Sequence, residues 1–330
     1  MYKIAFAGFR HNHITGLYNQ IKEDPRFEIA GAFEENEEAK IKAEEKGVIF
    51  NFNSLDEILE DEKIEIVAIG DYYSARGQIA IKAMEKGKHI IADKPLCTSL
   101  EEAHRIRELA NDKNLAVGVM FSLRSNKNVI IAKSLIDEGK IGKINNIIFE
   151  AQHPLMFGKR PSWYFDGNKQ GGTINDIAVH GIDLVRRFTR EETSEIIGAR
   201  CWNFYAKEAP DFKDSAQFML KMKDGCGVMG DVSYAAPESF GYTHPSYWHF
   251  RIWGEKGLID FREGGDGVTC YLADETEPIS ISEKPNGKDY DFLDDYVKAL
   301  GSDVYSLIYS EDTLRSTIQT LLIQLASDSE

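Results

Sequence analysis

The first 120 residues alternate between short apolar runs and amphipathic stretches, and this alternation restricts the possible fold more than any other feature of the chain. Apolar runs predict strands at 2–7, 27–33, 64–69, 89–92 and 116–120. Helices are predicted between them: one ending near Lys22, then 35–46, a short one capped by Ser54 and Glu57, 74–86 and 100–111. Strands separated by helices pair in parallel through right-handed crossovers. We therefore predict an α/β fold that begins with a doubly wound, Rossmann-type parallel sheet.

Ligands of such sheets bind at the carboxyl ends of the strands. We expect four loops to meet there, around Gly8–His13, Glu34, Gly70–Tyr73 and Asp93–Pro95. The first loop stands where a dinucleotide pyrophosphate would lie, over the N-terminus of a helix.

The glycine fingerprint of that loop is incomplete. Gly8 fills the first position of GxGxxG, and Phe9 follows it, but Arg10 and His13 replace the second and third glycines. Arg10, and His11 or His13, could instead offer positive charge or hydrogen-bond donors to the phosphates. The alternative is a Rossmann-like domain that binds no dinucleotide.

Glu34 ends the second predicted strand. An acidic side chain at this position accepts hydrogen bonds from the adenosine ribose and repels a 2′-phosphate, which favours NAD over NADP. The alternative is that Glu34 belongs to a charged surface run with Glu35, Glu37 and Glu38.

A second constrained turn follows the fourth strand, at Asp93-Lys94-Pro95. Proline fixes its own φ and restricts the preceding residue to an extended conformation, so Lys94 should be held firmly at the mouth of the sheet. Its ammonium could donate to a substrate oxygen and stabilise developing negative charge. A surface lysine at a strand end is the alternative when this turn is taken alone.

Residues 171–183 predict a helix entered from a Gly-Gly turn. Asp176, His180, Asp183 and Arg187 recur at i, i+4, i+7 and i+11, opposite an apolar stripe that runs from Ile174 to Phe188. A carboxylate one turn from an imidazole can orient it and tune its basicity. An ordinary amphipathic helix with a solvated polar face is the alternative.

These motifs together carry a resemblance. Gly-Lys-His-Ile-Ile-Ala-Asp-Lys-Pro-Leu at 87–96, Arg124 after the next strand, and Gly-Gly-x-x-x-Asp-x-x-x-His-x-x-Asp at 171–183 follow a sheet of the predicted order. This pattern resembles the Gfo/Idh/MocA family, which includes glucose–fructose oxidoreductase and inositol dehydrogenase, over essentially the whole chain.

The resemblance implies a catalytic set of Lys94, Asp176 and His180. It also implies that Asp71, Tyr72, Tyr73 and Arg76 lie beside the nicotinamide and its ribose, where the family commonly has Thr, Pro, Asn and His. Asp93 stands for the family's Glu. The expected cofactor-binding residues are Gly8, Phe9, Arg10, His11, Glu34, Asp71, Tyr72, Arg76, Asp93 and Lys94. The expected substrate-binding residues are Lys94, Arg124, His153, Trp163, Asp176 and His180.

The second half of the chain predicts a different architecture. A helix is expected at 122–139, followed by β-rich runs at 144–151, 196–206, 214–222, 226–233, 247–253, 257–261 and 268–272 and by closing helices at 290–300 and 311–326. Few helices intervene, so we expect a mainly antiparallel sheet in an α+β domain. We place the NAD-binding domain at 1–121 and the domain for substrate binding and oligomerisation at 122–330. Family resemblance implies that the open face of this sheet is covered in a homodimer or homotetramer.

Two loops of this half carry aromatic and polar side chains suited to a sugar ring. One holds His153, Arg160, Trp163, Tyr164 and Asp166, and the other holds Tyr242, His244, Tyr247, Trp248 and His249. Packing of Trp163 onto the core is an equally good interpretation of the first loop, and an interface is the alternative for the second.

The net charge of −15 argues against nucleic acid or an anionic membrane as a partner, since both attract basic surfaces. Four scattered cysteines form no CxxC pair, and no apolar run approaches a membrane span, so we expect reduced thiols in a cytoplasmic protein. We expect no metal: His11-x-His13 has no carboxylate nearby in the sequence, and two imidazoles alone make a poor site.

These observations predict a dehydrogenase that uses NAD, with NADP less favoured, to oxidise a secondary alcohol of a sugar or polyol. His180 would accept the hydroxyl proton, Asp176 would orient His180, and Lys94 would polarise the reacting oxygen, so Lys94 and His180 should converge on one substrate. Two alternatives remain open. One is an enzyme that recycles a tightly bound NAD, as in a glycosidase-type elimination, an epimerisation or an internal redox exchange. The other is a non-catalytic sensor of sugars or nucleotides.

Overall fold

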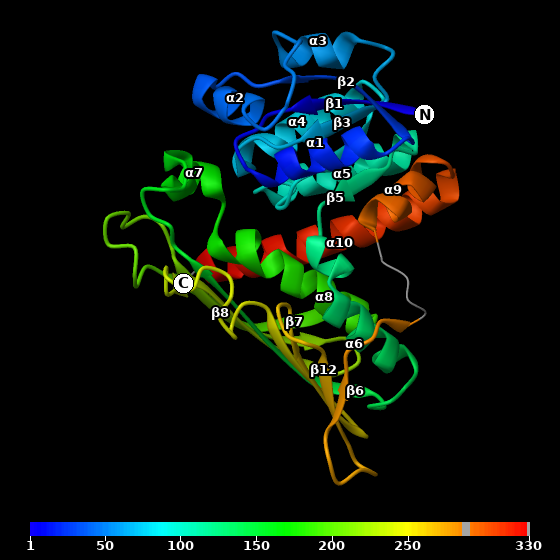
Figure 1. Ribbon diagram of the computed structural model, residues 1–330, viewed down its shortest axis with the longest axis vertical. Coiled ribbons are helices and arrows are strands. Elements are labelled where there is room, and N and C mark those ends of the chain that lie inside the picture. Colours follow the sequence, from blue (N-terminus) through cyan, green and yellow to red (C-terminus); the bar gives the residue numbers. More distant parts are fainter. Residues whose placement is uncertain (286–290, 329–330) are drawn as a thin grey trace. The chain divides into compact units, whose positions relative to one another are not determined.

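The computed structural model describes residues 1–285 and 291–328 (Figure 1). Its chain divides into two compact units. The first unit contains residues 1–120, 161–171 and 293–318, and the second contains residues 121–160, 172–292 and 319–330. The sequence predicts two consecutive domains that meet at 121/122, whereas this division assigns two later segments to the first unit.

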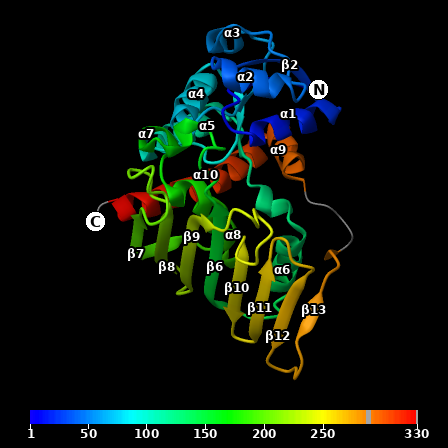
Figure 2. The same ribbon diagram turned by 60° about the vertical axis from the view of Figure 1, so that its left-hand side comes forward.

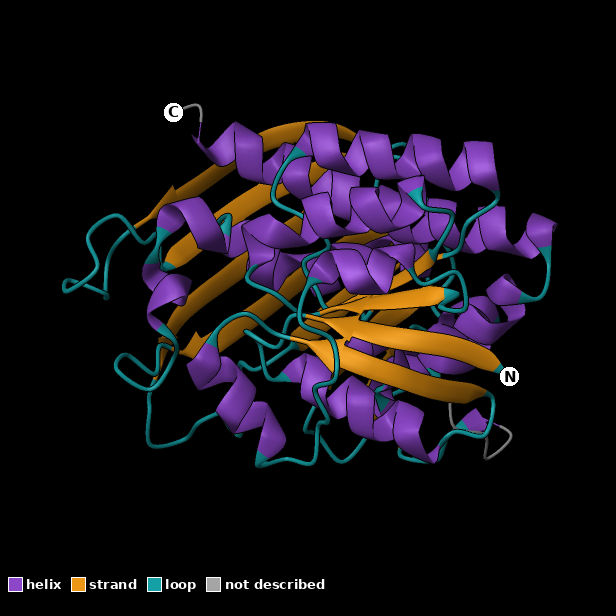
Figure 3. Cartoon of the chain, turned by 90° about the horizontal axis from the view of Figure 1, so that it is seen from above, coloured by secondary structure: helices purple, strands orange, loops and turns teal. Residues whose placement is uncertain are grey.

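The first unit is built on a five-stranded parallel sheet in the order β2-β1-β3-β4-β5. The strands are β1 (Tyr2–Ala7), β2 (Phe27–Phe33), β3 (Ile66–Ile69), β4 (His89–Ala92) and β5 (Val117–Val119). Figure 3 shows strands of this sheet beside the N-terminus, which run in the same direction. All four residues of β3 are buried, as expected for a central strand covered on both faces. The predicted Rossmann-type sheet is confirmed.

Helices connect these strands at the predicted places. They are α1 (His13–Glu23), α2 (Glu37–Glu44), α3 (Leu55–Glu60), α4 (Tyr73–Glu85) and α5 (Leu100–Lys113). The Ser54 hydroxyl accepts from the Glu57 N–H and so caps α3, while Glu57 reaches back to the Asn53 N–H. Within the same unit, η2 (Ser162–Phe165) and α7 (Gly167–Gln170) pack together, and Tyr296 of α9 (Phe292–Leu300) donates a hydrogen bond to the Ile90 carbonyl.

The second unit contains an eight-stranded sheet in the order β13-β12-β11-β10-β6-β9-β8-β7 (Figure 2). Its strands are β6 (Ile144–Pro154), β7 (Thr193–Trp202), β8 (Ser215–Met222), β9 (Gly227–Ala236), β10 (His249–Gly254), β11 (Gly257–Arg262), β12 (Val268–Leu272) and β13 (Ile279–Ile281). All recorded pairs are antiparallel except β6 with β9, which confirms a mainly antiparallel sheet. Strand β13 was not predicted.

Helices α6 (Lys127–Asp137) and α8 (Val179–Thr189) pack on one face of this sheet. Phe149, Phe218, Phe250 and Phe261 form the aromatic core of that face. A Cβ at Gly181 of α8 would lie 2.2 Å from the Phe149 ring, so glycine permits the close approach of helix and sheet.

Three predicted helices differ in the structure. The helix expected at 122–139 is divided into η1 (Ser122–Ser125) and α6, because Asn126 is extended and caps α6 with its side chain. The last helix, α10 (Asp303–Asp328), begins eight residues earlier than 311. The stretch at 174–188 begins with a π-helical turn, η3 (Ile174–Ala178), before α8. Of the helix expected at 290–300, residue 290 lies outside the described residues.

Candidate active site

The loop after β1 retains a close approach that requires glycine. Gly8 has φ +84°, and a Cβ there would lie 2.7 Å from the backbone nitrogen and Cβ of Asp71. Helix α1 begins just beyond, and its N-cap, Asn12, makes no capping hydrogen bond with its side chain. An uncapped helix N-terminus next to a tight glycine turn suits a pyrophosphate, so this loop fits a dinucleotide despite Arg10 and His13.

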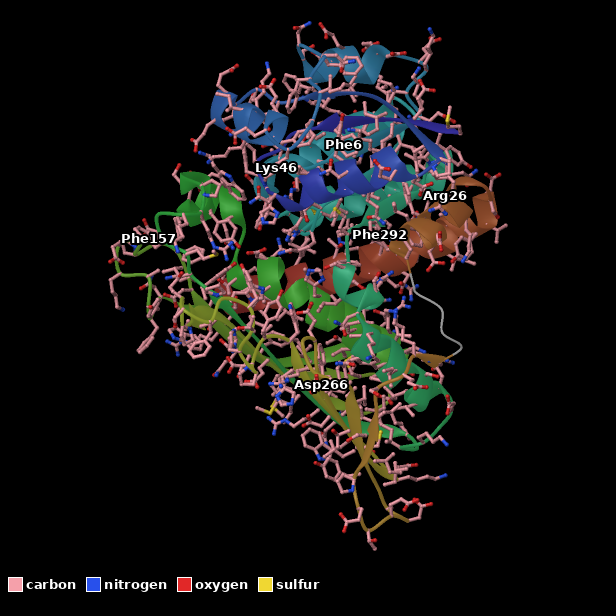
Figure 4. The ribbon with its side chains drawn as sticks, in the orientation of Figure 1. Phe6, Arg26, Lys46, Phe157, Asp266 and Phe292 are labelled. Carbon is pink, nitrogen blue, oxygen red and sulfur yellow. The ribbon has the colours of Figure 1, made fainter. Side chains whose placement is uncertain are left out.

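Glu34 is buried and engages this same loop. Its carboxylate accepts from the Phe9 N–H at 2.5 Å and from the Arg10 guanidinium at 2.7 Å. The solvated surface run proposed as the alternative for Glu34 is therefore wrong. Arg10 also contacts Glu35 and lies over the Tyr72 ring, while the Lys46 ammonium (Figure 4) donates to Asn12 at 3.1 Å. Arg10 and Lys46 give this end of the sheet two cations suited to phosphate.

Asp71 lies against the Gly8 turn, and its carboxylate accepts from the Tyr72 N–H at 2.6 Å. Burial, reinforced by the negative charge of Glu34, raises the pKa of Asp71 from 3.8 to about 6. The folded protein therefore holds a proton here that the unfolded chain releases between about pH 4 and pH 6.

We expect Asp71→Asn to raise the melting temperature at pH 7.5 and to leave it unchanged at pH 4. A carboxyl whose pKa is higher in the folded state makes the fold less stable as pH rises through the interval between its two pKa values. Asparagine carries no charge, so it removes this loss of stability, and its side-chain oxygen can still accept from the Tyr72 N–H. Thermal melts over pH 4–8 test this, with the exposed Asp274→Asn as control. A wild-type advantage at pH 7.5 would contradict the expectation.

Arg76 holds the Lys-Pro turn in place. Its fully buried guanidinium donates to the Asp93, Lys94 and Pro95 carbonyls at 3.0, 2.7 and 3.1 Å, and to the Asp93 carboxylate at 3.0 Å. These contacts make Arg76 a positioning residue for the turn, and its expected binding of the cofactor stays a prediction. Lys94 itself is buried, with its ammonium 5.9 Å from the centre of the Tyr73 ring.

Aromatic side chains surround Tyr73. The Arg76 guanidinium lies 4.6 Å from its ring centre, and the Trp163 ring meets it edge-on at 5.0 Å. Trp163 is buried, and its indole N–H has no hydrogen-bond partner among the residues that the structure describes. Trp163 therefore packs onto the first unit, as the packing interpretation proposed, while its N–H remains a donor suited to a ligand.

His11 and His13 lie beside a carboxylate that the sequence did not reveal. The Nδ1 atoms of His11 and His13 lie 2.7 and 3.1 Å from the two oxygens of Asp93. Burial alone would raise the pKa of Asp93, but Arg76 and the two imidazoles outweigh it and hold that pKa well below its usual range. Burial also lowers the pKa of His11 to about 4. The premise that no carboxylate lies near these histidines is thus wrong.

In the second unit, the polar side chains of the 171–183 motif are buried. Asp176, His180 and Asp183 are 1%, 7% and 1% exposed, so the alternative of a solvated polar face is wrong. Asp176 accepts a short hydrogen bond from the Tyr234 hydroxyl on β9. The π-helical turn places Asp176 and His180 in different helical segments, which changes the spacing expected from one regular helix.

An aromatic wall encloses His180. The Trp248 and Phe121 rings meet its imidazole edge-on at 5.6 and 6.1 Å. Trp248 has φ +52°, a left-handed conformation unusual for a bulky residue and common at functional sites. His153 contacts Trp248 and the rings of Tyr234, Tyr242 and Tyr247. Tyr234 was missed, because nothing local marks a tyrosine on β9 as the partner of Asp176.

Arg124 forms a buried ion pair with Asp183. Its guanidinium makes a bidentate contact with the Asp183 carboxylate, both are buried, and it lies over the Phe121 ring. Direct binding of substrate by Arg124 remains a prediction, while its visible contact fixes the start of the second unit to α8.

These motifs belong to a known family. The family model for the NAD-binding Rossmann fold of the oxidoreductase family GFO/IDH/MocA matches residues 3–121, and the model for the GFO/IDH/MocA C-terminal domain matches residues 129–260. The chain therefore belongs to the Gfo/Idh/MocA family of NAD-binding oxidoreductases.

Individual relatives include named sugar dehydrogenases. Levoglucosan dehydrogenase of Pseudarthrobacter phenanthrenivorans is 36% identical over 53% of this chain and 45% of its own length. Glucose-6-phosphate 3-dehydrogenase of Bacillus subtilis is 29% identical over 89% of this chain and 84% of its own length. A levoglucosan dehydrogenase solved with NADH and levoglucosan superposes with a TM-score of 0.76, at 21% identity over 99% of this chain and 96% of that one. At that identity the superposition shows the fold alone.

No helix within residues 1–285 and 291–328 is long and apolar enough to cross a membrane. The four cysteines form no disulfide within the part of the chain that the structure describes.

Proposed function

We propose that this protein is an NAD-dependent dehydrogenase that oxidises a secondary alcohol of a sugar or polyol. The observation that carries the proposal is the buried pair of Asp176 and His180, enclosed by aromatic side chains in a family whose characterised relatives act on sugars. Burial of a carboxylate and an imidazole costs free energy that a purely structural helix would avoid.

The first unit would hold the dinucleotide. The N-terminus of α1 and Arg10 would face the pyrophosphate, and Glu34 would face the adenosine ribose. Glu34 also supports NAD over NADP, because its negative charge would repel a 2′-phosphate. The nicotinamide, when bound, accepts a hydride from the substrate carbon.

The protein's own residues would accept the hydroxyl proton and stabilise the charge that develops on the reacting oxygen. His180 would accept the hydroxyl proton, and Asp176, itself held by Tyr234, would orient His180 or bind a neighbouring hydroxyl. Lys94, held in its turn by Arg76, would donate to the reacting oxygen. Lys94 and His180 belong to different units, so their joint action on one substrate stays a prediction.

A panel of sugars and inositols with NAD and with NADP, followed by NADH or NADPH absorbance, tests this function. We expect NAD reduction with at least one sugar or polyol. Bound NAD in the purified protein, with turnover but no net NADH, would instead support a recycled cofactor. No thermal shift with NAD or NADH would support the non-catalytic alternative.

We also propose that the chain forms at least a dimer through the face of the eight-stranded sheet opposite α6 and α8. Met219 and Met229 pair across β8 and β9 and are 43% and 51% exposed, beside a hollow that Arg200 and Arg251 also line. Exposed apolar side chains on an open sheet face are typical of interfaces.

Sedimentation should show a dimer or tetramer, and Met229→Lys should shift it toward monomer, because a charged ammonium would then replace an apolar side chain within the proposed interface. Ile41→Lys, at an exposed position of α2, is the matched control. A clean monomer of the wild-type protein would contradict this proposal.

A further inference from the structure

We propose that His11, His13 and Asp93 form a binding site for a divalent transition metal, Zn²⁺ in the first instance. One ligand atom from each side chain lies within 4.8 Å of the others. Two imidazoles and a carboxylate form one of the ligand sets that zinc uses with three protein ligands and one open position.

The geometry of the three side chains suits a metal. The Nδ1 atoms of His11 and His13 approach different oxygens of the Asp93 carboxylate, at 2.7 and 3.1 Å, so the three groups already point toward one another.

The surroundings hold the ligands and leave a way in. Arg76 donates at 3.0 Å to Asp93 Oδ2, the oxygen that His11 Nδ1 also approaches, and so fixes the carboxylate, as outer contacts do in metal sites. Tyr73 meets the His11 ring edge-on at 5.8 Å. The His13 side chain is 51% exposed, whereas that of Asp93 is fully buried, so a metal would reach the site past His13.

The charge of Arg76 limits the affinity. It offsets the single negative charge of Asp93, so the site is close to neutral before the metal arrives. We therefore expect micromolar binding of Zn²⁺, weaker than that of a structural zinc site. The site shares His11 and Asp93 with the residues expected to bind the cofactor, and His13 begins α1. Its test needs no nucleotide, so the metal site and the proposed function can each fail alone.

Calorimetry on the full chain, after chelation and without nucleotide, tests the site with ZnCl₂. We expect one Zn²⁺ per chain, at least tenfold weaker binding in His13→Gln, and no binding in His11→Gln/His13→Gln. The exposed His104→Gln, on α5, is the matched control and should bind as the wild type does. Co²⁺ should give an absorption band of a four-coordinate site in the wild type that His13→Gln weakens.

Because His11 is half-buried, the double variant could be less stable, and circular dichroism must show it folded. His13→Gln changes an exposed side chain, so it tests the site even if the double variant does not fold. Absence of stoichiometric Zn²⁺ binding to the wild type would overturn the proposal, and so would equal affinity in the wild type and His13→Gln.

Discussion

His180→Ala and Lys94→Ala are each expected to lower kcat by roughly 10²–10⁴-fold while leaving NAD affinity nearly unchanged. Removal of a general base, or of a group that stabilises developing charge, typically lowers the rate by about this factor. The dinucleotide would rest on the first loop and on Glu34, which neither substitution touches. Steady-state kinetics with the substrate found in the sugar panel measure kcat, and NADH fluorescence titration measures the affinity for the dinucleotide.

His104→Ala is the matched control for His180→Ala, since His104 is exposed on α5 and should be neutral. The double variant Lys94→Ala/His180→Ala tests whether the two side chains act as a unit. If both serve the same proton and oxygen, their effects should be far from additive. Unchanged turnover in both single variants would refute the catalytic assignment, and fully additive losses would refute their joint action.

Arg76→Met is expected to destabilise the fold by about 3–5 kcal/mol, because it breaks a buried ion pair. Methionine keeps much of the volume but leaves the Asp93 carboxylate buried without its guanidinium partner. Three backbone carbonyls of the Lys-Pro turn lose a donor as well. Urea unfolding followed by circular dichroism measures the loss.

Two variants separate charge from packing. Arg76→Met/Asp93→Asn should recover part of the stability, because the buried charge is then removed with its partner. Arg105→Met removes an exposed, solvent-screened ion pair of α5 and should change the stability little. A loss in Arg76→Met no greater than that in Arg105→Met would contradict the role of Arg76 as the support of the turn.

Much of the first unit could be predicted because its signals are local. An apolar run of four to seven residues between amphipathic stretches identifies a buried strand without reference to the rest of the chain. The strand at 89–92 was predicted residue for residue, and the cap at Ser54 was recognised from two residues three positions apart. The π-helical turn at Ile174–Ala178 was missed, because it depends on the packing of the turn rather than on a residue type.

The sequence by itself determined the alternation of strands and helices in the first unit, the glycine at position 8, the Lys-Pro turn and the Asp176 and His180 motif. Each of these is specified by residues that are close together along the chain, through periodicity, positive φ or restricted backbone. It also supported the family, because the two motifs occur in the expected order.

Only the tertiary structure decided what each polar group contacts. Asp93 meets His11 from 82 positions away, and Tyr234 meets Asp176 from 58 positions away. Arg76 proved to support the turn that holds Lys94, and the polar face of the 171–183 stretch proved to be buried. The physical reason is that hydrogen bonds and burial depend on distance in space, which no spacing along the chain reports.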